Sequence, residues 1–113
     1  WYSDYDSFLF ERPSKQTIQT IEKTSVAILS KASMNQLYDD LPRFERFGRL
    51  MAENAFMGLR QRTEALTQLS ALDRYMRLVE NRPKVIQRVP QRFIASYLGI
   101  RPQSLSRIRK SIT

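Results

Sequence analysis

The chain contains 113 residues, with 19 lysines and arginines against 11 aspartates and glutamates, and it has neither cysteine nor histidine. Disulfides, thiolate or imidazole metal ligands and a histidine general base are therefore excluded. No constellation of the remaining reactive side chains stands out, so we expect a protein that is not an enzyme and that needs no cofactor. No apolar run approaches the ~18 residues of a membrane span and no signal peptide is visible, so the expected location is the cytoplasm, with no membrane partner.

The net charge of +8 is unevenly distributed along the chain. Residues 1–42 hold six acidic and four basic side chains, and residues 43–80 hold five acidic and seven basic ones. Residues 81–113 hold no acidic side chain, which predicts a surface for nucleic acid or another polyanion, with a solvated basic face as the alternative. The eight basic side chains of this segment are Arg82, Lys84, Arg88, Arg92, Arg101, Arg107, Arg109 and Lys110.

The pattern over residues 1–30 is typical of β structure. Two short β-branched runs, separated by the polar pair Glu22 and Lys23, follow a loop at Pro13. Two short strands cannot fold alone, so we expect them to be the end of a larger antiparallel sheet, with further native residues before Trp1. The β-branched positions are Ile18, Ile21, Val26 and Ile28.

A helical pattern begins near Ser33. A short helix is expected to end at Pro42, and a long one runs from Arg43 to Leu69 without an internal proline. At ~1.5 Å per residue the long helix would measure about 40 Å, which is more than a small monomer needs. Its apolar stripe is therefore expected to contact a partner outside the domain's own core, and the alternative is a helix that packs only on its own domain.

The long helix carries features of a helix that pairs with a second copy. Ala52, Ala55 and Gly58 would let another helix approach closely, and Asn54 resembles the buried polar residue that fixes the register of paired helices. We therefore predict a homodimer. The predicted interface residues are Phe47, Met51, Asn54, Ala55 and Gly58.

A further helix is expected from Ser70 to about Arg82. Ser70 and Asp73 have the spacing of a capping box, with Asp in place of Glu, and Pro83 ends the helical pattern. The segment "KVIQRV" after it is expected to be a connector. The apolar face of this helix consists of Leu72, Tyr75, Met76 and Val79.

Two short helices follow, over 91–98 and from Pro102 onward. Pro90 fits a first helical position, and Gly99 stands where a helix end needs a left-handed residue. In the second helix Leu105, Ile108 and Ile112 recur on one face, which is expected to pack inward. The opposite face holds Gln103, Ser106, Arg107 and Lys110.

This arrangement is typical of a helix-turn-helix that binds double-stranded DNA. Arginine bonds guanine bidentately in the major groove, and glutamine does the same to adenine. The main alternative is a helical protein–protein interaction module whose basic end binds an acidic partner. The predicted DNA-binding residues are Arg92, Arg101, Gln103, Ser104, Ser106, Arg107, Arg109 and Lys110.

The segment "RYMRLVENRPKVIQRVPQRFIASYLGIRPQSLSRIRK" closely resembles the C-terminal DNA-binding part of the cyclic-AMP receptor/FNR (Crp/Fnr) family of bacterial transcription regulators. The likeness is greatest to the branch whose recognition helix reads "SLSRIRK". It extends back over the chain, because the helix at 43–69 is similar to that family's dimerisation helix. Residues 1–30 are similar to the last part of its cyclic-nucleotide-binding jelly roll.

The resemblance implies a mostly α-helical chain with a few N-terminal β-strands. Residues 1–42 would be the end of a cyclic-nucleotide-binding-like sensor domain, 43–69 the dimerisation helix, and 70–113 a winged-helix-like helix-turn-helix domain whose wing is not among these residues. It also implies transcription regulation by a homodimer under the control of a ligand or signal at the sensor. RNA polymerase would be a further partner.

The resemblance also places an effector site. In the family, an acidic residue binds the ribose of the cyclic nucleotide and an arginine binds its cyclic phosphate. The acidic position falls at Asp4, whereas the arginine position falls at Ser14, beside Lys15. Because a cyclic phosphate held without a guanidinium loses its bidentate partner, we expect cyclic nucleotide to bind weakly or not at all at Asp4, Ser14 and Lys15.

Overall fold

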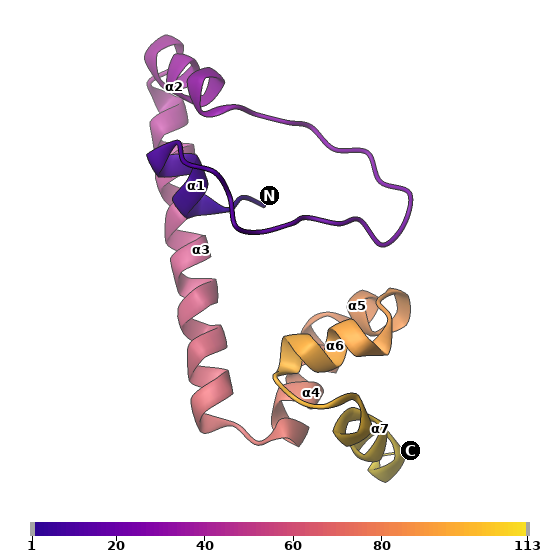
Figure 1. Cartoon of the computed structure of the whole chain (residues 1–113). Coiled ribbons are helices and arrows are strands. Elements are labelled where there is room, and N and C mark those ends of the chain that lie inside the picture. The colour runs from indigo at the N-terminus through magenta and orange to yellow at the C-terminus, as the bar shows by residue number, and fades with distance from the viewer. Residues whose placement is uncertain (1, 113) are drawn as a thin grey trace. The chain divides into compact units, whose positions relative to one another are not determined.

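A computed structural model describes residues 2–112 of the chain (Figure 1). These residues form seven α-helices and contain no β-strand, so the mostly helical class expected from the sequence is confirmed. Contacts within the chain divide it into two compact units, one that ends at Ala52 and one that begins at Glu53. The long helix α3 (Arg43–Gln68) contributes residues to both units.

The first unit contains α1 (Tyr5–Phe10), α2 (Lys31–Asp40) and the first turns of α3. Helix α2 begins where the Ser30 hydroxyl accepts a hydrogen bond from the backbone N–H of Ser33 at 3.1 Å, which satisfies one of the free donors of the first turn. Aromatic rings then connect α2 to α3, because the Tyr38 and Phe44 ring centres are 6.1 Å apart.

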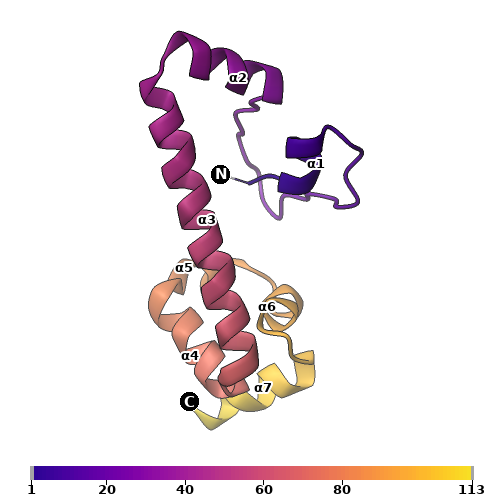
Figure 2. The same cartoon turned by 90° about the vertical axis from the view of Figure 1, so that its left-hand side faces the viewer.

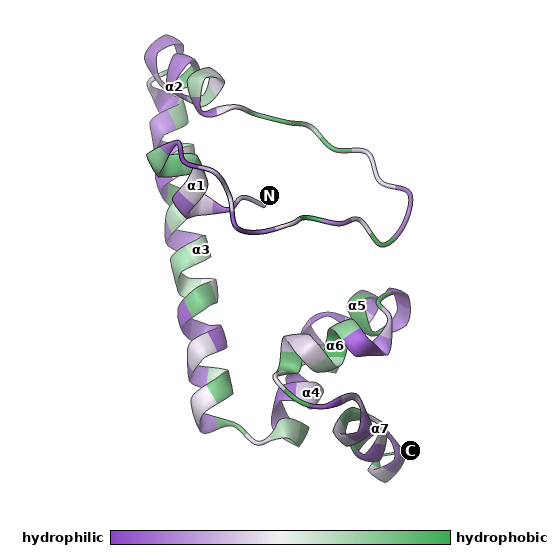
Figure 3. Ribbon diagram, in the orientation of Figure 1, coloured by the Kyte–Doolittle hydropathy of each residue, from purple (hydrophilic) through white to green (hydrophobic). Residues whose placement is uncertain are grey.

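The expectation of β structure over residues 1–30 is wrong for the part of the chain that the structure describes. Residues 5–10 form α1, and the segment from 12 to 30 is a long loop without a paired strand (Figure 1). Most of its apolar side chains lie in solvent: Ile18 is 66% exposed, Val26 70% and Ile28 92%, and Figure 3 shows apolar stretches along the loop. A strand needs a neighbour for its backbone groups and a layer to cover its apolar face, and the first unit provides neither.

Helix α3 has 26 residues and matches the helix expected over 43–69 to within one residue. At ~1.5 Å per residue it is about 39 Å long. None of its side chains is buried in the single chain. The large apolar residues that it exposes are Phe47, Leu50, Phe56, Met57, Leu59 and Leu66.

The second unit gathers α4 (Ala71–Asn81), α5 (Pro83–Arg88), α6 (Gln91–Leu98) and α7 (Pro102–Ser111) into one cluster (Figure 2). The helices expected over 70–82, over 91–98 and from Pro102 are therefore confirmed. Helix α5 was expected to be a connector, but Val85, Ile86 and Val89 pack against the core and Pro83 occupies its first turn. The buried core consists of Tyr75, Leu78, Ile94, Ala95, Leu98 and Leu105.

Local signals fix the ends of these helices. The Ser70 hydroxyl accepts from the Asp73 N–H at 3.1 Å and donates to its carboxylate at 2.6 Å, so the expected cap of α4 is confirmed. Gly99 ends α6 with φ 67°, a left-handed conformation that side chains rarely adopt. A Cβ atom at Gly99 would also lie 3.1 Å from Cδ2 of Leu66, so both backbone and packing favour glycine there. Pro90 is the N-cap of α6 and not its first helical residue as expected.

Candidate nucleic-acid interface

Helix α7 has one face in the core and one in solvent. Leu105 is fully buried and Ile108 packs against the same core, so these two side chains fix which face of the helix points inward. Ile112 was expected to continue this inner face, but it follows the last helical residue and is 47% exposed. The outer face carries Gln103, Ser106, Arg107 and Lys110, which are all exposed.

The predicted DNA-binding residues therefore lie mostly in solvent. Gln103, Ser106 and Arg107 follow one another at i, i+3 and i+4 along the outer face of α7 and can reach a common surface. Ser104 and Arg109 are half-buried at the edges of that face. Arg101 is exposed at the N-cap of α7, and Arg92 is exposed on α6.

The chemistry of the outer face suits a polyanion that carries hydrogen-bonding groups. It offers an amide, a hydroxyl and cationic side chains, and Figure 3 shows that α7 is hydrophilic over much of its length. No carboxylate side chain occurs from residue 81 to the end of the sequence, so nothing on α5, α6 or α7 repels a phosphate. An α-helix with its side chains is 10–12 Å wide, and the major groove of DNA is about 12 Å wide.

An open hollow lies beside this face, and residues of both α6 and α7 line it. It is lined by Gln91, Ser106, Arg109 and Lys110, which come from the first turn of α6 and from the outer side of α7. Polar and cationic side chains around the free N–H groups of a helix start suit phosphate oxygens. The sequence reasoning missed Gln91, for which the only available signal is its place at the start of a helix.

The guanidinium of Arg92 lies over the ring of Phe93, 4.6 Å from the ring centre. Stacking of this kind restricts an otherwise flexible side chain at the surface of α6. Arg92 belongs to a different helix from the residues on α7, so its contacts with a ligand would be separate from theirs.

The predicted dimer residues share one stripe of α3. Phe47, Met51, Asn54 and Gly58 follow at alternating spacings of four, three and four residues, and Ala55 lies at the edge of the stripe. Met51 is half-buried and the other four are not covered, with Phe47 42% exposed. No atom comes within 4 Å of a Cβ placed at Gly58, so space remains there for another helix.

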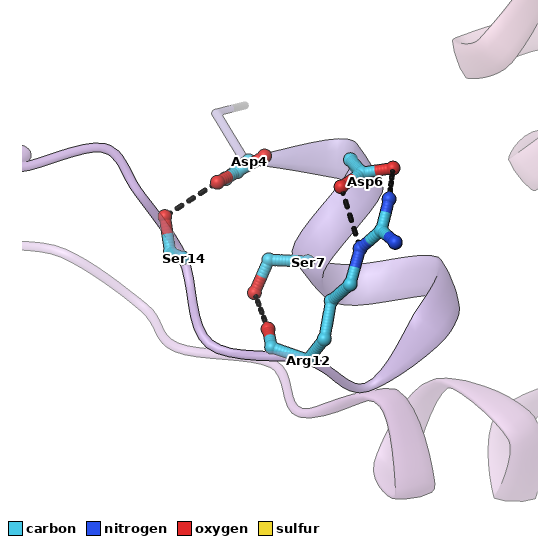
Figure 4. Close-up of polar contacts among 5 residues, drawn as sticks. All are labelled: Asp4, Asp6, Ser7, Arg12 and Ser14. Atoms are coloured by element: carbon cyan, nitrogen blue, oxygen red, sulfur yellow. Dashed lines mark hydrogen bonds and ion pairs between the residues drawn. The ribbon is translucent and has the colours of Figure 1, made fainter.

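The three predicted effector residues are only partly brought together. The Ser14 hydroxyl donates to the Asp4 carboxylate at 2.5 Å (Figure 4), and both residues line an open hollow with Tyr2, Ser7 and Gln16 among others. Lys15 is exposed and is not among the lining residues of that hollow.

Arg12 is the arginine nearest in sequence to this hollow, and its guanidinium is bound elsewhere. Its Nε donates to the Asp6 carboxylate at 2.8 Å, and its Nη2 donates to the second oxygen (Figure 4). The Ser7 hydroxyl also donates to the backbone carbonyl of Arg12 at 2.6 Å and so holds the turn after α1. A bidentate pair of this kind occupies the geometry that a cyclic phosphate would need.

We expect cyclic AMP to bind weakly or not at all, because Ser14 cannot replace a guanidinium and Arg12 is paired with Asp6. Calorimetric titration of the native full-length protein with cyclic AMP should give no saturable heat at micromolar ligand. Sub-micromolar binding would contradict this prediction. The variant Lys15→Ala would then show whether the lysine ammonium holds the phosphate instead.

No family model, no curated protein and no solved structure matches this chain. Among residues 2–112, no helix combines the length and the apolar character that crossing a bilayer requires. The same residues contain no group of three or more aspartates and glutamates placed to hold a metal ion.

Proposed function

We propose that this protein is a sequence-specific DNA-binding transcription regulator that acts as a homodimer in the cytoplasm. The observation that carries the proposal is the outer face of α7, where Gln103, Ser106 and Arg107 are exposed above the buried Leu105. This face lies within a segment that contains no acidic residue. A helix held by its inner face, with hydrogen-bonding and cationic side chains outward, suits the reading of base edges.

In this proposal α6 and α7 form a helix-turn-helix. Residues Gly99, Ile100 and Arg101 join the two helices, and the left-handed Gly99 makes the tight turn. Gln103, Ser106 and Arg107 would contact bases, whereas Arg109 and Lys110 near the end of α7 would contact phosphates. Phosphate contacts position a protein on the duplex, and base contacts select the sequence.

The resemblance to the Crp/Fnr family supports the same proposal and adds its regulation. Residues 1–42 would belong to a cyclic-nucleotide-binding-like sensor domain, and a signal there would change the placement of the two DNA-binding domains. Contact with RNA polymerase would follow from this role. No cofactor is proposed.

A second candidate function is a helical protein–protein interaction module with a basic surface. The exposed apolar side chains of α3, among them Phe56 at 66% and Leu59 at 63%, favour contact with another protein. Binding to an acidic partner protein requires no preference for a DNA sequence, and this difference separates the two functions.

The homodimer can be tested at Gly58. Because nothing lies within 4 Å of a Cβ there, Gly58→Leu causes no clash within one chain, and it raises the intrinsic helix propensity by roughly 1 kcal/mol. We therefore expect Gly58→Leu to weaken the dimer without loss of helix content, and Met51→Glu to weaken it through an unpaired charge. Sedimentation equilibrium measures the dissociation constant.

Gly58→Ala is the matched control, since it adds helix propensity with one methyl group and should leave the dimer largely intact. An unmodified protein that sediments as a monomer at tens of micromolar would contradict the assignment of α3. Equal dissociation constants for the protein and for Gly58→Leu would contradict the predicted face.

Selection from randomised DNA duplexes tests the proposed function. A dimer with two copies of α7 should enrich an inverted repeat whose half-sites lie about one helical turn, ~34 Å, apart. Recovery of unrelated sequences after repeated rounds would show that the basic segment binds DNA without reading it, or binds a different partner.

A further inference from the structure

Arg74 on α4 hydrogen-bonds to the ends of two other helices. Its Nη1 donates to the backbone carbonyl of Leu69 at 2.7 Å, and its Nε donates to the backbone carbonyl of Leu98 at 3.0 Å. Leu69 directly follows α3, and Leu98 is the last residue of α6. The side chain is half-buried, and its one guanidinium connects α4 to the ends of α3 and α6.

Two further contacts join α3 to the C-terminal end of α6. The guanidinium of Arg62 on α3 lies 4.2 Å from the ring centre of Tyr97 on α6. Cδ2 of Leu66 lies next to the Cα atom of Gly99, where a Cβ would come to 3.1 Å. The last turns of α3 therefore lie against the C-terminal end of α6, directly before the turn that leads to α7.

A guanidinium is well suited to this position. The last carbonyls of a helix have no partner within the helix and carry the negative end of its dipole. Arg74 meets two such ends at once because its donors are fixed in a planar fork, which a lysine ammonium lacks. The connection between α3 and α4 is short, with only Leu69 and Ser70 between them, so α4 must follow the end of α3 closely.

We propose that Arg74 is a positioning residue that fixes the α6–α7 pair against the C-terminal end of α3. A displacement of the end of α3 then moves α6 and α7 with it. In a dimer, the distance between the two copies of α7 therefore depends on the hydrogen bonds that Arg74 makes. The expected effect of Arg74 on DNA binding rests on the function proposed above. The positioning of α6 and α7 by Arg74 within one chain does not.

Spin-label distances test the link without DNA. The chain has no cysteine, so Thr63→Cys on α3 and Ser111→Cys on α7 place labels at two exposed positions, and an excess of unlabelled protein isolates distances within one chain. We expect a narrow distance distribution with Arg74, a broad one with Arg74→Met, and an intermediate width with Arg74→Lys. The control is Arg77→Met, an exposed position on the same helix, which should leave the distribution narrow.

DNA binding tests the consequence of the link. The probes are the inverted repeat recovered by selection, versions with the half-sites moved closer or further apart, and a duplex with a single half-site. Arg74→Met should bind the original repeat about tenfold more weakly and should discriminate less between spacings. Its affinity for the single half-site should equal that of the unmodified protein.

The outcomes separate the two proposals. A narrow distance distribution in Arg74→Met overturns the positioning role, whatever the DNA results. An equal loss of affinity for the repeat and the half-site, together with lower helix content, also overturns it, because Arg74 would then be needed only for folding. A broad distribution in a protein that prefers no duplex overturns the DNA-binding function and leaves the positioning role standing.

Discussion

Leu105→Ala is expected to lower the free energy of unfolding by about 2–5 kcal/mol. Leu105 is fully buried and attaches α7 to the core formed by α4 and α6, so removal of its side chain leaves a cavity that the small unit cannot easily fill. Small domains have total stabilities of about 5–15 kcal/mol, so the loss is a large fraction of the whole. Urea denaturation followed by circular dichroism measures it, at one fixed protein concentration because dimerisation adds to the stability.

Leu72→Ala is the control for this experiment. Leu72 is 41% exposed on α4 and lies outside the proposed dimer helix, so the same substitution there should change the free energy of unfolding by no more than about 0.5 kcal/mol. If Leu105→Ala unfolds at the same urea concentration as the unmodified protein, the inner face of α7 is assigned wrongly. The outer face would then be wrong as well, because the two are opposite sides of one helix.

Arg107→Ala is expected to weaken binding to the preferred duplex by roughly 1–3 kcal/mol, mostly by relaxing the preference at one base pair. Arg107 is exposed on the face opposite Leu105, so its replacement should leave the fold intact. Titration of the preferred duplex and of a scrambled duplex measures the effect. The affinity for the scrambled duplex should change little.

Lys110→Ala is the matched comparison on the same helix. Lys110 is the last residue but one of α7 and lines the hollow with Gln91, where a phosphate would be held. We expect it to weaken binding to both duplexes equally and to lower the salt slope by about one. If Arg107→Ala also lowers both affinities equally, Arg107 contacts only phosphate. Gln103 and Ser106 would then be the residues of α7 that contact bases.

The helices could be predicted from the sequence wherever apolar periodicity coincided with local end signals. Ser70 with Asp73, Gly99, and Pro102 each fix a helix end through their own backbone or side-chain chemistry, and the structure places the ends there. Such signals act within a few residues, so a reader of the sequence can recognise them without knowing the fold.

The elements that were missed depend on what the segment packs against. Helix α5 has only six residues. The apolar Val85 and Ile86 within it and Val89 directly after it form a run that periodicity alone does not assign to helix or connector. The β-branched residues before α2 have high strand propensity, but strand formation needs a neighbouring strand and a covering layer. The described residues provide neither, and the short helix α1 had no distinguishing pattern in the sequence.

The outer face of α7 could be predicted because it follows from one helix and its spacing. The link made by Arg74 could not, because both of its acceptors are backbone carbonyls and one belongs to Leu98, far along the chain. A carbonyl has no residue type and leaves no trace in the sequence. The role of Gln91 in the hollow was missed for a similar reason, since only the fold brings α6 beside Ser106 and Lys110.

The most direct measurement of DNA reading is the affinity of the native full-length protein for the selected duplex and for a scrambled duplex over a series of salt concentrations. Sequence-specific regulators bind their sites at least about 10³-fold more tightly than other DNA, and both affinities fall steeply with salt because phosphates are neutralised. We predict at least this ratio between the affinities for the selected and the scrambled duplex, and a steep fall of both affinities with salt concentration. Equal affinity for the two duplexes at every salt concentration would contradict the proposed reading of DNA by α7.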